Sequence, residues 1–62
     1  MDRLKHLLEH WIEHSREHNS KYLEWAKKIR DERPDVAELI VKAVEKFREG
    51  ERFLEEAYKR LE

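Results

Sequence analysis

The chain has no cysteine, only one glycine and only one proline among its 62 residues. Without cysteine, neither a disulfide nor a thiolate metal site can supply the stability that so short a chain cannot obtain from a large core. No apolar run approaches the roughly 20 residues of a membrane span, and the N-terminus has no signal-peptide apolar core. We therefore expect a cytoplasmic protein that is stabilised by a metal ion or by oligomerisation.

An excess of charge of one sign is also missing. Charged residues make up 47% of the chain, yet the formal net charge is only −1. A chain without a large single-sign field has nothing that draws it to nucleic acid or to an anionic membrane. We expect neither as a partner.

The first half of the sequence, from about residue 2 to about residue 31, has the periodicity of a long helix. Asp2 fits the N-cap position. Apolar positions alternate steps of four and three residues, as in a coiled-coil seam, and Leu7 and Ile12 widen the stripe on either side. The middle of this seam is polar. Its positions are Leu4, Leu8, Trp11, Ser15, His18, Tyr22, Trp25 and Ile29.

Pro34 ends the first helix, because proline cannot donate to the preceding turn and forces Arg33 out of helical geometry. A turn at about residues 32–34 leads directly into a second helix at about 34–61, which begins either with Pro34 at its first position or with Asp35 as a cap. The pattern continues through Gly50, which favours one unbroken helix over two shorter ones. The second seam consists of Val36, Ile40, Ala43, Phe47, Gly50, Leu54, Ala57 and Leu61.

Two long helices joined by so short a turn form an antiparallel hairpin, so the fold class is all-α and residues 1–62 form a single domain. Pairing the helices about the turn places His18 opposite Phe47, Gly50 and Glu51. Two helices alone cannot bury stripes this wide. We expect a homodimer that forms a four-helix bundle, since two-fold dimers are the commonest oligomers.

Histidines form the one pattern in the sequence that indicates chemistry. His6, His10, His14 and His18 are all the histidines of the chain, and each step is four residues. On a helix this spacing brings successive imidazoles close enough for two rings to bind one metal ion. Each ring is rotated about 40° from the one before. The ladder therefore spirals toward the predicted seam. His6 lies almost opposite the seam and His10 on its flank. His14 lies at the edge of the buried stripe and His18 near its centre.

Two interpretations of this histidine ladder remain open. In one, the imidazoles bind metal, and three histidines of one helix need a second ladder across a dimer, a glutamate or water to complete the coordination sphere. In the other, the outer histidines are solvated and the inner ones are half-buried polar residues. Glu9, Glu13 and Glu17 each follow a histidine by three residues and would orient an imidazole or join the metal. The aromatic side chains are expected in the core.

The run LLEHWIEHSREH, followed by Tyr22 and by Trp25 and Ala26, resembles a group of small prokaryotic helical-hairpin proteins. In that group a histidine-bearing first helix is associated with the handling of transition metals, particularly nickel. The resemblance covers the first helix, about half of the chain, and maps onto His10, Trp11, His14 and His18. His6, the turn at Pro34 and Gly50 lie outside it. The resemblance implies a metal-binding role without identifying the metal.

These patterns predict a non-catalytic protein that binds a divalent transition metal through His6, His10, His14 and His18. Nitrogen ligands suit nickel, cobalt, zinc or copper, and disfavour calcium and magnesium. The alternative is a helical-bundle oligomerisation or interaction module whose histidines gain charge in mildly acidic solution and repel one another. Haem held by His18 from two chains is a remoter option. We do not expect an enzyme, because the sequence has no nucleophile constellation and no glycine-rich phosphate loop.

Overall fold

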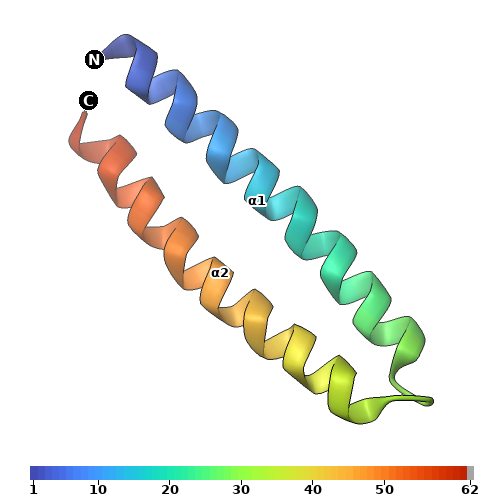
Figure 1. The fold of residues 1–62 in the computed structure, drawn as a ribbon. Coiled ribbons are helices and arrows are strands. Elements are labelled where there is room, and N and C mark those ends of the chain that lie inside the picture. The colour runs from blue at the N-terminus through green and yellow to red at the C-terminus, as the bar shows by residue number, and fades with distance from the viewer. Residues whose placement is uncertain (62) are drawn as a thin grey trace.

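The computed structural model describes residues 1–61 and consists of two long helices. Helix α1 spans Asp2–Ile29 and helix α2 spans Pro34–Arg60. They lie side by side in opposite directions, with both termini at one end and the turn at the other (Figure 1). The prediction of an all-α antiparallel hairpin is confirmed. Glu62, the last residue of the predicted domain, lies outside the described residues.

The turn forms as the proline predicts. Arg33 occupies the N-cap of α2 with φ −137° and ψ 72°, outside the helical region, and Pro34 is the first helical residue. The Arg33 side chain donates to the two carboxylate oxygens of Asp35 at 3.3 and 3.2 Å. Asp35 is therefore an acidic partner in the first turn and does not cap the helix. Asp2 is not a cap either, because α1 begins at Asp2 itself and Met1 precedes it.

The contact between the helices is built on small and aliphatic side chains at seven-residue spacing. Its buried apolar residues are Leu8, Ile12, Ala26, Ala37 and Val44, and the seam also buries Asn19 and Glu51. Leu8 is a position of the predicted seam, whereas each of the other six buried residues lies one residue after such a position. For these six residues the predicted register is therefore wrong within the hairpin.

The physical reason is the size of the side chains in the two candidate registers. Alanine and valine allow two helix backbones to approach closely, whereas the indole rings of Trp11 and Trp25 would hold them apart. The structure places the small residues between the helices and leaves Trp11 46% and Trp25 59% exposed. Within a single hairpin the two tryptophans therefore lie outside the core, so the expectation that the aromatic side chains are core residues is not met there for Trp11 and Trp25.

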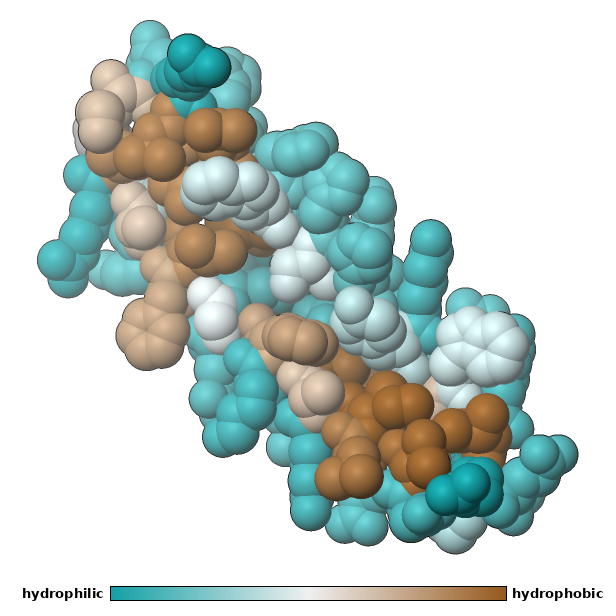
Figure 2. Space-filling model, viewed as in Figure 1, coloured by the Kyte–Doolittle hydropathy of each residue, from teal (hydrophilic) through white to brown (hydrophobic). Residues whose placement is uncertain are grey.

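These displaced aromatic residues share one broad side of the molecule. Trp11, Tyr22 and Trp25 follow one another at helical spacing along α1, and the Tyr22 ring meets the Phe47 ring of α2 at a centroid distance of 5.8 Å. We call this side, with Leu7, the apolar face. Figure 2 looks onto it, and the most hydrophobic residues gather toward both ends with paler ones between them.

Gly50 lies within the unbroken helix α2, as the periodicity predicts. It is exposed, however, and a Cβ atom added there would have no neighbour within 4 Å. The prediction that Gly50 occupies the buried face of the hairpin, opposite His18, is therefore wrong. The same one-residue change of register that exposes Trp11 turns Gly50 away from α1.

Neither α1 nor α2, as far as residues 1–61 describe them, contains a stretch apolar enough to cross a membrane.

Candidate functional site

The histidine ladder lies along the N-terminal two thirds of α1. The ring centroids of His10 and His14 are 4.1 Å apart, with planes inclined at 59°. Those of His14 and His18 are 6.4 Å apart. The helix thus brings neighbouring imidazoles together in pairs, and His10 and His14 form the closest pair.

The ladder follows the surface from the outer edge of the hairpin onto the apolar face. The side chain of His6 is 84% exposed, and its Nδ1 lies 3.9 Å from a carboxylate oxygen of Glu9. His18 is also exposed. Its predicted place at the centre of the buried stripe is wrong for the hairpin, because the neighbouring Asn19 occupies the seam instead.

His18 nevertheless lies in an organised part of the surface. Its ring stacks on Tyr22 at a centroid distance of 6.1 Å and an angle of 22°, and Tyr22 in turn contacts Phe47. These side chains surround a hollow of about 150 Å³ near the middle of the apolar face. Its lining consists of Ser15, His18, Asn19, Tyr22 and Phe47.

In a single hairpin, the histidines come close to one another only as neighbouring pairs among the described residues. Within residues 1–61, no three or more histidine, aspartate or glutamate side chains come together in a way suited to hold a metal ion. Glu9 is engaged elsewhere, since it accepts a hydrogen bond of 2.6 Å from the Tyr58 hydroxyl of α2. Glu13 lines a groove beside Ile12 and Arg16. The four predicted ligands therefore share one helix without surrounding one point.

A polar pair in the seam is the feature that sequence reasoning missed. Asn19 and Glu51 are 3% and 7% exposed, and the Asn19 Nδ2 donates to Glu51 Oε1 at 3.0 Å. The Asn19 Oδ1 is buried and has no hydrogen-bond partner among the described residues. The available signal was the spacing: Ile12, Asn19 and Ala26 are seven residues apart, as are Val44 and Glu51.

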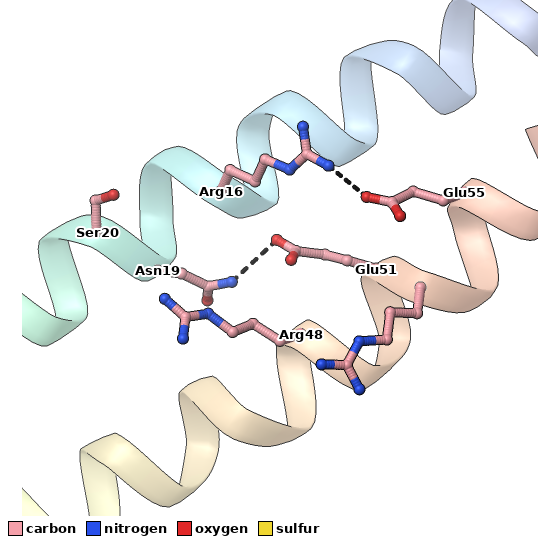
Figure 3. A pocket seen from close by; sticks show the side chains of 7 residues that line it. Arg16, Asn19, Ser20, Arg48, Glu51 and Glu55 are labelled. Atoms are coloured by element: carbon pink, nitrogen blue, oxygen red, sulfur yellow. Dashed lines mark hydrogen bonds and ion pairs between the residues drawn. The ribbon is translucent and has the colours of Figure 1, made fainter.

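Asn19 and Glu51 line a groove on the side of the hairpin opposite the apolar face. Figure 3 shows this groove at close range. Arg16 of α1 forms an ion pair with Glu55 of α2 beside it. The groove, of about 410 Å³, runs over these contacts. We call this side the charged face; its groove is lined by Arg16, Asn19, Ser20, Arg48, Glu51, Arg52 and Glu55.

Comparison with known proteins identifies the family of the hairpin. A family model described as a domain of unknown function (DUF8180) matches residues 4–61, which include all of α2 and all of α1 except its first two residues. The chain belongs to the DUF8180 family. An uncharacterized protein of Archaeoglobus fulgidus is 44% identical over 57 residues, and the match covers 92% of each chain. No solved structure matches the chain. The DUF8180 match thus corresponds to the whole hairpin, including the ladder.

Proposed function

We propose that this protein is a non-catalytic binder of a divalent transition-metal ion, and that His10, His14 and His18 are the ligands with His6 as an outer contributor. The observation that carries the proposal is the 4.1 Å separation of the His10 and His14 rings on an exposed helix face. Two imidazoles at this separation can turn toward one ion, which requires each nitrogen to lie about 2.0–2.1 Å from it. Imidazole ligands select nickel, cobalt, zinc or copper.

His14 is the decisive residue, because it belongs to both neighbouring pairs of the ladder. We expect His14→Ala to weaken metal binding at least tenfold in a calorimetric titration of the untagged protein with Ni²⁺, Co²⁺, Zn²⁺ or Cu²⁺. His6→Ala is the comparison variant, since it removes the same side chain from the outer contributor and should weaken binding less than His14→Ala. Equal affinities of wild type and His14→Ala, or no uptake of any of the four ions, would refute the proposal.

A binding ion should also stabilise the helices. A ligand that binds only the folded state raises its stability by about 2.7 kcal/mol when its free concentration is a hundred times the dissociation constant. We therefore expect the thermal midpoint of the wild type to rise with added metal and to return on chelation. The His14→Ala protein should show little of this rise, which separates binding at the ladder from binding elsewhere.

The second candidate is a helical interaction module, and the uncovered apolar face favours it. Trp11, Trp25 and Phe47 are each more than 40% exposed, an unusual position for large apolar side chains on one side of a small protein. In this function the histidines tune assembly and bind no metal. If the protein is an interaction module, removing all four histidines would leave its oligomeric state unchanged at neutral pH. If it is a metal-binding protein, the same change would abolish metal binding.

A further inference from the structure

The broad side that carries the apolar face is large enough for a stable interface. The hairpin measures 47 Å by 15 Å across this side. As a flat rectangle, with its polar residues included, the side covers on the order of 700 Å², close to the roughly 800 Å² that each partner buries in a standard protein interface. Among residues 1–61, the seam between the helices buries only five apolar side chains, too few to stabilise a chain of this length without help.

The pattern on this face is self-complementary. Hydrophobic residues gather at the end with the termini and at the end with the turn, and more polar residues lie between them (Figure 2). If a second copy docks face to face about a two-fold axis, apolar ends meet apolar ends and the polar middle meets itself. The hollow beside His18 lies in this middle part.

The histidines lie close to where such an axis would pass. Helix α1 runs from Asp2 to Ile29, so its midpoint falls beside Ser15, between His14 and His18. With a rise of about 1.5 Å per residue, these two histidines lie within about 4 Å of the midpoint along the helix, on either side of it. An axis that crosses the hairpin at this level stacks α1 antiparallel on α1 of the second copy. His14 of each copy then lies opposite His18 of the other.

We infer that a second copy of this chain covers the apolar face, and that His14 and His18 of both copies together bind one divalent transition-metal ion. The metal part of this inference rests on the proposed function; the docking part rests on the apolar face alone. Two copies supply four imidazole nitrogens, the number that a tetrahedral zinc site requires. The incomplete site of a single hairpin is thereby completed without a carboxylate.

The docking part is tested by sedimentation of the full chain at micromolar concentration. We expect a mass of two chains for the wild type and of one chain for Phe47→Glu, which places a charge in the middle of the apolar face. Phe53→Glu is the matched control, because Phe53 is 78% exposed and lies six residues, about 240°, further around α2. It should remain a dimer. Circular dichroism must show that both variants are helical. A monomeric wild type, or dimers of all three proteins, would overturn the inference.

The shared site is tested by the stoichiometry of Zn²⁺ or Ni²⁺ binding. We expect one ion per two chains and a loss of at least tenfold in affinity for His18→Ala. One ion per chain, lost with His10→Ala, would leave the proposed function standing and overturn the shared site. A dimer that takes up no ion would refute both the shared site and the proposed function, and would leave only the docking surface.

Discussion

The two broad sides of the hairpin use their side chains in different ways. On the charged face, polar groups of α1 meet polar groups of α2: Arg16 pairs with Glu55 beside the buried bond between Asn19 and Glu51. On the apolar face, the contact of Tyr22 with Phe47 bridges the helices and the tryptophans remain open to solvent. The comparison teaches that the apolar stripe of each helix is wider than its contact within the hairpin needs. One edge of each stripe forms the seam between the helices. The rest of the stripe stays exposed on the apolar face.

The largest effect is expected from a charge placed in the seam, which tests whether the seam is the core of the hairpin. Val44 is 1% exposed, so Val44→Asp would bury a carboxylate without a partner. An uncompensated buried charge costs about 3–5 kcal/mol, enough to unfold a hairpin of this size. We expect the helical circular dichroism to be lost. Leu39→Asp, at a position 65% exposed, is the control and should remain folded. A folded Val44→Asp protein would mean that the seam is not the core.

The polar pair tests what the centre of the seam contributes. Asn19→Ala removes the donor to Glu51 and leaves a carboxylate 7% exposed without its hydrogen bond. We expect a loss of about 1–3 kcal/mol in denaturant unfolding at fixed protein concentration. Replacing both residues by leucine removes the buried polar groups together, and that double variant should be at least as stable as the wild type. A double variant less stable than the wild type would assign the pair a stabilising role.

A substitution at Gly50 tests an exposed position of α2. Its backbone is helical, its φ is not positive, and an added Cβ would have no neighbour within 4 Å. Gly50→Ala should therefore stabilise the hairpin by about 0.8–1.0 kcal/mol through helix propensity. Thermal unfolding at low protein concentration measures this gain. A destabilisation that grows with concentration would instead show a second chain packed closely against Gly50.

The smallest effect is expected at the turn, which belongs to neither face. The Arg33 guanidinium, followed by the backbone at Val36, holds the pKa of the Asp35 carboxyl below its ordinary value of 3.8. Because the folded state favours the ionised form, this contribution is present above 3.8 and is lost as the pH falls through the lower folded value. Wild type and Asp35→Asn should therefore differ slightly in thermal midpoint at neutral pH and converge in strong acid. A constant difference would indicate a steric effect.

Periodicity predicted the helices well and their mutual rotation poorly. Pro34 defined the turn, and the pattern through Gly50 correctly predicted one long second helix. The seam was placed one residue too early, because periodicity locates the centre of an apolar stripe. In this chain that centre, around Trp11 and Phe47, lies beside the contact between the helices and not within it. Each apolar stripe contributes to both the seam and the apolar face, so the centre of the stripe lies between these two surfaces.

The candidate site was predictable in part for the same reason. Four-residue spacing alone places His10 beside His14, since both lie on one helix. The neighbours of His18 depend on the rotation of α1 against α2, so its exposure on the apolar face was not predictable. Asn19 and Glu51 come from different helices, and only the packed hairpin brings them together.

The sequence by itself determined what local rules control: two helices, a turn at the proline, a cysteine-free chain and a ladder of imidazoles one turn apart. Only the tertiary structure decided which edge of each apolar stripe is buried. That choice depends on how closely two backbones can approach, which the small side chains of Ala26, Ala37 and Val44 permit and the large rings of Trp11 and Trp25 prevent. The aromatic residues and His18 therefore lie on an open face because smaller residues fit between the helices.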